Sequence, residues 1–270
     1  MRARRDIQTV VSFLTTRVRR PDQDDWGKLV RVLRYLTGTK HMKLNLTIDD
    51  LSSIYWWVDA SYGTHHDGKG HTGMMMSMGK GAILSSSKKQ KMNTKSSTES
   101  ELVGIDDCIS KILWSKYFIE SLGYSVEHNI LFQDNKSTIL LAQNGRLSSS
   151  AKTRHIKQRY FFVKDKIEQG DLEIEYVPTD KMWSDINTKP KQGKSFRDFR
   201  AQLMNIDPVY DDDKERLLTH KNLLPNPALT QQTAKHIDTL KTSLIGVSKP
   251  HHQRRSVLGD SIPLGGVSVE

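Results

Sequence analysis

Four acidic residues stand where an α/β protein exposes side chains to one shared crevice. Asp59 and Asp134 each end an apolar strand pattern. Glu101 lies in the first turns of a long helical pattern, and Asp185 stands where the last helix is expected to begin. Carboxylates gathered at such strand ends and helix starts repel one another unless a cation neutralises them. Hard divalent cations prefer these oxygen ligands, and two of them about 3.5–4 Å apart can hold the attacking and leaving oxygens of a phosphodiester displacement.

Each acid taken alone also has an ordinary structural explanation. An aspartate after a strand is more often a turn former than a ligand, and Asp134 followed by Asn135 fits a plain strand-to-helix turn with a cap. Asp185 fits an acid at a helix N-terminus, where the helix dipole favours negative charge. The joint placement of all four acids is what favours a metal site.

The stretch SSTESEL, residues 96–102, contains two glutamates that must be told apart. Two residues along a helix correspond to about 200° of rotation, so Glu99 and Glu101 point to opposite sides. Glu101 heads the apolar line that continues through Ile105, Cys108 and Ile112. Glu99 follows Ser96 by three residues, which is the spacing of a capping box. We therefore expect Glu99 to cap the helix and Glu101 to face the sheet as a metal ligand.

The elements that must position these acids follow the order β-β-β-α-β-α-α-β-α after residue 52. Strand patterns lie in 52–89, which holds three of them, and in 129–134 and 171–178. Helical patterns lie in 97–123, 135–145 and 153–170, and a last one begins near 184. Three tightly joined strands indicate an antiparallel sheet, and the later strands separated by helices indicate parallel additions. The sequence thus predicts an α/β fold with a mixed five-stranded sheet flanked by helices.

The composition limits the partners of the chain. Its 270 residues carry a net charge of +10, which favours a polyanion such as nucleic acid, although a generic basic surface is the alternative. Cys108 is the single cysteine, so no intramolecular disulfide can form. No apolar run approaches the roughly 18 residues that span a membrane, and the basic N-terminus lacks the apolar core of a signal peptide. We expect an intracellular protein with no membrane partner.

Six segments resemble the ribonuclease H domains of copia-type retrotransposon polyproteins, in the same order along the chain. They are VDASYG, SSTESELVG, FQDNKSTILL, KTRHIKQRYFFVKDKI, EIEYVPT and SDINTKP, which together cover about residues 54–200. Residues 2–45 look like the segment that joins the reverse transcriptase to the ribonuclease H. The resemblance implies a helical remnant of the reverse transcriptase end at 1–48 and an RNase H-like domain at 50–204. The residues after these are polar with few large apolar side chains, which predicts a mostly disordered polar tail at 205–270.

The resemblance also implies a function and a set of site residues. It implies metal-dependent endonucleolytic cleavage of the RNA strand of RNA–DNA hybrids, with two Mg²⁺ ions that Mn²⁺ can replace. The catalytic, metal-binding acids of the family carry over to Asp59, Glu101, Asp134 and Asp185. The partners would be the hybrid and the reverse transcriptase portion of the polyprotein, in a cytoplasmic virus-like particle or in the nucleus.

Two groups of basic and polar residues are the candidates for holding the hybrid through its phosphates and 2′-hydroxyls. The first lies in the run 85–98 and comprises Lys88, Lys89, Lys91, Asn93, Thr94 and Lys95. The second opens the helix after 153 and comprises Arg154 and His155. A solvated basic turn is the alternative for the first group, and a structural role is the alternative for His155.

The sequence departs from the family pattern in ways that keep other functions open. Ser61 stands where family members often have a second acid, and no polymerase aspartates of the YxDD kind occur. We therefore expect a fragment of a polyprotein or a chain that begins at an internal methionine. The alternatives are a catalytically inactive nucleic-acid-binding remnant of the same domain and another nuclease or transposase of this fold class.

Overall fold

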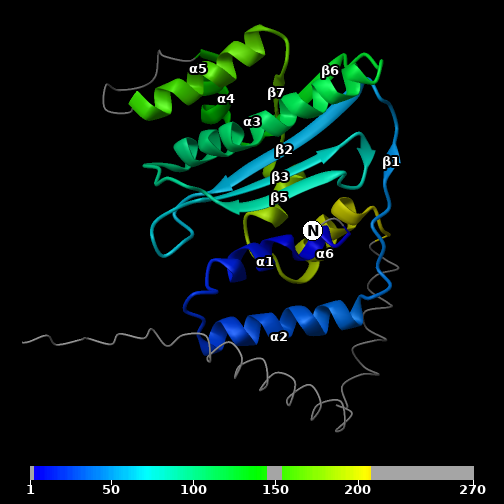
Figure 1. Ribbon diagram of the computed structural model, residues 1–270, viewed down its shortest axis with the longest axis vertical. Coiled ribbons are helices and arrows are strands. Elements are labelled where there is room, and N and C mark those ends of the chain that lie inside the picture. The colour runs from blue at the N-terminus through cyan, green and yellow to red at the C-terminus, as the bar shows by residue number, and fades with distance from the viewer. Residues whose placement is uncertain (1–2, 145–153, 208–270) are drawn as a thin grey trace, which may run out of the picture. The chain divides into compact units, whose positions relative to one another are not determined.

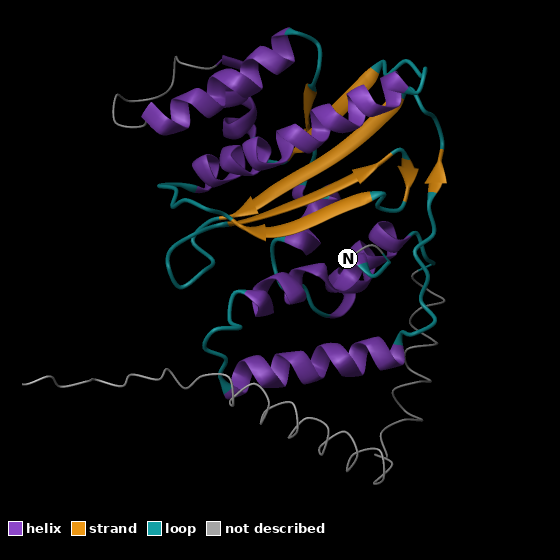
Figure 2. Ribbon diagram, viewed as in Figure 1, coloured by secondary structure: helices purple, strands orange, loops and turns teal. Residues whose placement is uncertain are grey.

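The computed structural model describes residues 3–144 and 154–207, with the side chains of residues 154–160 outside the described part. Seven strands are assigned in this part (Figures 1 and 2), namely β1 Thr47–Ile48, β2 Ser53–Ser61, β3 His71–Ser77, β4 Gly79–Lys80, β5 Leu84–Lys89, β6 His128–Gln133 and β7 Glu173–Tyr176. The α-helices of this part are α1 Gln8–Thr15, α2 Gln23–Gly38, α3 Ser97–Ser121, α4 Lys136–Asn144, α5 Arg154–Glu168 and α6 Gly193–Met204. Short 3₁₀ helices are η1 Arg5–Ile7, η3 Thr179–Lys181 and η4 Trp183–Asn187.

The main sheet has five strands in the order β5-β3-β2-β6-β7. The β2–β3 and β3–β5 pairs are antiparallel, whereas β2–β6 and β6–β7 are parallel. The predicted mixed sheet, with three antiparallel strands followed by parallel additions, is therefore confirmed. A separate ladder between β1 and β4 was not predicted, because two residues a strand are too few for a recognisable pattern.

The sheet is buried on both faces, which explains why the β2 segment IYWWV is apolar without alternation. Trp56 and Val58 enter the core formed with α3, and Trp57 enters a second core formed with η4 and α6. Helix α3 lies along one face of the sheet in Figure 1, while α1 and α6 lie at the other. Side chains alternate between the two faces along a strand, so Asp59, two residues after Trp57, points to the same face as Trp57. This is the face covered by η4, and Asp59 lies near the end of β2.

The segment around Asp185 differs from the prediction. We expected SDINTKP to begin a helix that Pro190 interrupts or ends, but Asp185 lies in the 3₁₀ helix η4, and α6 begins only at Gly193. Pro190 supplies the physical reason. A proline lacks the backbone N–H that continues a helix, and it disfavours the helical conformation in the residue before it.

The N-terminal helices pack on the sheet and on η4. Arg5 Nη2 donates a hydrogen bond to the carbonyl of Ile83 at 2.6 Å, beside the edge strand β5. Thr9 Oγ1 donates to the carbonyl of Ile186 in η4 at 2.5 Å.

The division into regions at residues 48 and 204 stays a prediction, and residues 208–270 of the predicted tail lie outside the described residues. Among the helices that the structure describes, none is long and apolar enough to cross a membrane.

Candidate active site

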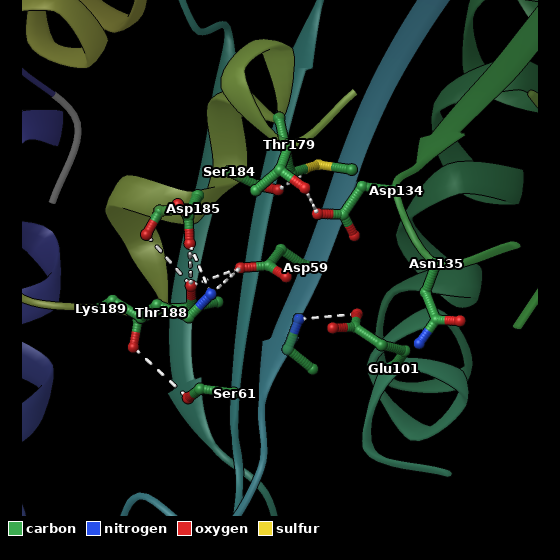
Figure 3. Close-up of polar contacts among 12 residues, drawn as sticks. Asp59, Ser61, Glu101, Asp134, Asn135, Thr179, Ser184, Asp185, Thr188 and Lys189 are labelled. Atoms are coloured by element: carbon green, nitrogen blue, oxygen red, sulfur yellow. Dashed lines mark hydrogen bonds and ion pairs between the residues drawn. The ribbon is translucent and has the colours of Figure 1, made fainter. Parts of the chain in front are cut away.

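Three of the four predicted acids come together at one end of the sheet. Asp59, Glu101 and Asp134 each offer one carboxylate oxygen, and these oxygens all lie within 4.8 Å of one another. Figure 3 shows the three side chains converging from β2, from the second turn of α3 and from the residue after β6. Their meeting follows from topology, because the carboxyl ends of the parallel neighbours β2 and β6 share one edge of the sheet.

Glu101 reaches this group because α3 approaches β2 closely. A methyl group at Gly104 would lie 3.3 Å from the Cβ of Ala60, so the glycine permits the short helix–strand distance. The buried Glu101 carboxylate accepts a hydrogen bond from the Ala60 backbone N–H at 2.8 Å and a longer one from Gln133 Nε2 at 3.5 Å. These donors fix the carboxylate in the position from which it faces Asp59 and Asp134.

Glu99 has the capping role that the sequence predicts. Ser96 is the N-cap of α3, and its hydroxyl accepts a hydrogen bond from the Glu99 backbone N–H at 3.2 Å. The Glu99 carboxylate accepts from the backbone N–H of Lys95 at 2.7 Å, one residue before the position that a standard capping box uses. The structural role of Glu99 is therefore confirmed.

The turn after β6 also separates two polar residues by role. Asn135 Oδ1 accepts a hydrogen bond from the Thr138 backbone N–H at 3.2 Å and so caps α4. The backbone N–H groups of Asp134 and Asn135 donate to Gln133 Oε1 at 2.8 and 3.0 Å. The Asp134 carboxylate makes no cap, and it accepts a hydrogen bond from Thr179 Oγ1 at 2.9 Å. Asn135 thus supplies the turn chemistry and leaves the Asp134 carboxylate for the site.

Asp59 is held from the opposite side by the segment that follows η4. Gly73 pairs with Asp59 across the β2–β3 ladder, and a Cβ at Gly73 would lie 2.6 Å from Thr188 Cγ2 and 2.7 Å from the Ser184 carbonyl oxygen. The absence of a side chain at Gly73 therefore lets this segment pack directly on the sheet. Thr188 Oγ1 donates a hydrogen bond to Asp59 Oδ2 at 2.5 Å.

Asp185 is buried beside Asp59, but its carboxylate is neutralised by lysines. Lys189 Nζ lies 2.9 Å from Asp185 Oδ1, and Lys191 Nζ forms an ion pair with Asp185 Oδ2. Lys189 Nζ also lies 3.9 Å from Asp59 Oδ2. The two lysines and Thr188 were not predicted as site residues, although all three lie in or directly after the quoted SDINTKP segment. The i,i+4 spacing of Asp185 and Lys189 was the signal that could have identified one of them.

Burial and charge shift the pKa values of these acids in different directions. Burial, together with the nearby charges of Asp185 and Asp134, raises the pKa of Asp59 to about 6 against the opposing effects of Lys189 and Thr188. Burial, followed by the charge of Asp59, raises the pKa of Glu101 well above its ordinary value. Burial alone would also raise the pKa of Asp185, but its contacts with the two lysines lower it overall. Mutually repelling buried carboxylates fit a hard divalent cation.

The raised pKa of Asp59 predicts how the metal-free protein responds to pH. An acid whose pKa is higher in the folded state stabilises the fold fully below its unfolded pKa, and this contribution is lost as pH rises through the folded pKa. The free energy of unfolding in the presence of a chelator should therefore fall between about pH 4 and pH 6, by on the order of 2 kcal/mol for this residue. Urea unfolding at several pH values measures it. In Asp59→Asn the free energy of unfolding should change less steeply with pH over this range. An unchanged pH dependence in that variant would contradict the raised pKa of Asp59.

The predicted nucleic-acid residues differ in how they are placed. Lys88, Lys91 and Lys95 are exposed, on β5 and in the loop before α3. Two further members of the first group make contacts within the protein: Lys89 pairs with Asp67 at 2.8 Å, and the Asn93 amide donates to the Asp67 carbonyl at 3.1 Å. Thr94 is buried. The side chains of Arg154 and His155 lie outside the described part of the structure. The binding role of all these residues stays a prediction.

Sequence relatives of the chain are transposon polyproteins. It is 30% identical over 202 residues to the retrovirus-related Pol polyprotein from transposon RE2 of Arabidopsis thaliana, and 29% identical over 202 residues to that from transposon RE1 of the same plant. Both matches cover 74% of this chain. The retrovirus-related Pol polyprotein from transposon TNT 1-94 of Nicotiana tabacum is 28% identical over 187 residues, which is 69% of this chain. The chain spans 14% of the length of each of these three relatives.

Solved structures of ribonucleases H are more distant matches. LC11-RNase H1, isolated from compost by a metagenomic approach, is 16% identical with a TM-score of 0.39, and the match covers 51% of this chain and 93% of that one. LC11-RNase H1 in complex with an RNA/DNA hybrid matches with 14% identity and a TM-score of 0.38, over 50% and 94% of the two chains. These superpositions are too loose to support a function.

No protein-family model matches the chain. The mixed five-stranded sheet flanked by helices agrees with the RNase H-like fold that the resemblance implies. The sequence relatives are retrovirus-related Pol polyproteins of transposons. The chain is therefore a homologue of the retrovirus-related Pol polyproteins of copia-type transposons, and its described part has a ribonuclease H-like fold.

Proposed function

We propose that the protein is a metal-dependent endonuclease that cleaves the RNA strand of RNA–DNA hybrids. The observation that carries the proposal is the convergence of Asp59, Glu101 and Asp134, with oxygens within 4.8 Å of one another at the carboxyl ends of two parallel strands. The hybrid as substrate is what the resemblance to ribonuclease H domains of transposon polyproteins implies, and the similarity to transposon Pol polyproteins supports it. The basic charge of the chain fits a polyanionic substrate.

The donor set fits Mg²⁺, with Mn²⁺ as a substitute. Asp59, Glu101 and Asp134 would hold a cation between them, and Asp185 beside Asp59 would be the fourth acid of a two-ion site. When bound, such ions supply an activated water for attack on the phosphate and stabilise the leaving 3′ oxygen. No side chain has to act as the nucleophile.

The work of the protein is to fix these acids before substrate arrives. The Ala60 N–H and Gln133 orient Glu101, and the Thr188 hydroxyl orients Asp59. Thr179 donates a hydrogen bond to one oxygen of Asp134, and within the described part of the chain the other oxygen has no hydrogen-bond donor. Positioning of this kind lowers the reorganisation that the reaction requires.

The exposed lysines at the same end of the sheet would hold the hybrid. Lys88 pairs with Thr72 across the β3–β5 ladder, and Thr72 pairs with Ala60, so Lys88 stands two strands away from the residue after Asp59. With neighbouring strands about 4.8 Å apart, this places the Lys88 backbone about 10 Å from β2. Lys88, Lys91 and Lys95 would contact backbone phosphates, so cleavage should show little sequence preference.

The partner of the domain in a full polyprotein would be its reverse transcriptase portion. The chain spans 14% of the length of its relatives, so the remainder of such a polyprotein would supply the hybrid and hold it. We propose that the protein acts inside the cell, in virus-like particles or in the nucleus.

A substrate panel tests the proposed function. The full chain is incubated with an end-labelled RNA–DNA hybrid, duplex DNA and single-stranded RNA, each with Mg²⁺, with Mn²⁺ and with a chelator. We expect cleavage of the RNA in the hybrid with either ion, none with chelator, and little cutting of duplex DNA. Metal-dependent cutting of duplex DNA with the hybrid spared would overturn the proposal. Tight hybrid binding without cutting would instead favour a catalytically inactive remnant.

A further inference from the structure

Two ammonium groups lie inside the acidic site, on the side opposite Glu101. Lys189 Nζ stands 2.9 Å from Asp185 Oδ1 and 3.9 Å from Asp59 Oδ2, and Lys191 Nζ pairs with the other oxygen of Asp185. The two aspartate side chains are only 3% and 4% exposed, so each ion pair has a buried carboxylate. Figure 3 shows Lys189 between Asp185 and Asp59, with Asp134 and Glu101 beyond.

The charge balance of the site follows from these contacts. When all four carboxylates are ionised, as metal ligands are, they carry four negative charges, and the two lysines compensate two of them. The remaining two negative charges match a single divalent cation in the group formed by Asp59, Glu101 and Asp134. A second divalent ion on the Asp185 side would compete with an ammonium for the same carboxylate oxygens and would be repelled by it.

The two lysines differ in how firmly they are held. Lys191 has a side chain that is 22% exposed, and its ammonium stands 5.0 Å from the ring centre of Phe199, so the ring and Asp185 both hold it. Lys189 has a side chain that is 48% exposed, and its charged end can reach solvent by rotation of its own side chain. Lys189 is therefore the lysine that can leave the site.

We propose that Lys189 is a built-in cation that holds the place of a second divalent ion between Asp59 and Asp185 and must leave before this ion binds. The inference rests on the proposed metal-dependent function and adds a residue that sets the order of ion binding. The group formed by Asp59, Glu101 and Asp134 takes the first ion with Lys189 in place. The second ion binds only at the cost of displacing the ammonium, so it binds more weakly.

Counting bound Mn²⁺ tests this inference without any turnover. Free Mn²⁺ is measured by electron paramagnetic resonance in titrations of the full chain, with wild type, Lys189→Met and Lys194→Met compared. Methionine keeps the unbranched length and removes the charge. Lys194 lies in the first turn of α6 and, among the described residues, makes no ion pair with the four acids, so it is the matched control. We expect one tight and one weak ion in wild type, and a second ion that binds about ten-fold or more tightly in Lys189→Met.

A second readout is the stability of the metal-free protein. With a chelator present, Lys189→Met should lower the melting temperature more than Lys194→Met, because Asp59 and Asp185 lose a shared counter-charge. Addition of Mn²⁺ should restore the melting temperature of Lys189→Met. Equal Mn²⁺ isotherms for wild type and Lys189→Met would overturn the inference alone. An equal gain in Lys194→Met would also overturn it, since the effect would then be one of net charge. No Mn²⁺ binding by any variant would overturn both the inference and the metal dependence of the proposed function.

Discussion

Asp134→Asn should abolish cleavage of an RNA–DNA hybrid while leaving the protein folded. Asparagine has the same shape, and its amide oxygen can still accept the hydrogen bond that Thr179 donates at 2.9 Å. The cap of α4 is made by Asn135 and is untouched by the change. The substitution therefore removes one negative charge from the group of three carboxylates and little else. A loss of several kcal/mol of charge stabilisation corresponds to a rate that falls by about 10²–10³-fold or more.

Initial rates with a labelled hybrid and Mg²⁺ measure this effect, and circular dichroism with thermal melting checks the fold. Asp180→Asn is the matched control, because Asp180 is an exposed acid in η3, directly after Thr179. The control should cleave at the wild-type rate. An Asp134→Asn protein that cleaves within two-fold of wild type would remove Asp134 from the site.

Glu101→Gln should cost far more activity than Glu99→Gln, although the two glutamates stand only two residues apart. Glu101 is buried against Ala60 and faces the other acids, so its charge is part of the site. Glu99 bonds the backbone of Lys95 outside the helix, and glutamine can make the same contact. We expect a loss of about 10²–10³-fold for Glu101→Gln. Glu99→Gln should stay within about three-fold of wild type, with a stability loss of at most about 1 kcal/mol.

The comparison needs both rates and stabilities, measured with hybrid cleavage and urea unfolding. Because Glu101→Gln removes a repelled buried charge, its metal-free form should be at least as stable as wild type. The stability measurement therefore distinguishes an activity loss caused by unfolding from one caused by removal of the Glu101 carboxylate. Equal activity losses in the two variants would contradict the assignment of Glu101 to the site and of Glu99 to the helix cap.

The arrangement of the sheet and the meeting of three acids were predictable because both follow from local patterns. Asp59 and Asp134 end strands whose apolar runs are clear in the sequence, and parallel neighbours bring strand ends to one edge. The roles of Glu101 and Glu99 could be distinguished because, at 3.6 residues per turn, side chains two residues apart point to opposite sides of a helix. These inferences need only the period of each element and the order of elements.

The surroundings of Asp185 were not predictable in the same way. Pro190 ends the helical pattern early, and the resulting 3₁₀ turn directs Lys189 and Lys191 toward Asp185. The close packing at Gly73 depends on a strand register that pairs it with Asp59, and register is a property of the assembled sheet. Asp134 and Asn135 are both good turn residues, so spacing alone could not decide which of them caps α4.

The chemical ends of the RNA fragments released from a hybrid test the central claim most directly. The full chain and Asp134→Asn are incubated with hybrid and Mg²⁺, and the RNA products are analysed by mass spectrometry. Attack of water with loss of the 3′ oxygen leaves a 5′-phosphate on one fragment and a 3′-hydroxyl on the other. We expect these ends with wild type and no products with Asp134→Asn. Fragments that carry 2′,3′-cyclic phosphates, or equal amounts of product from both proteins, would contradict it.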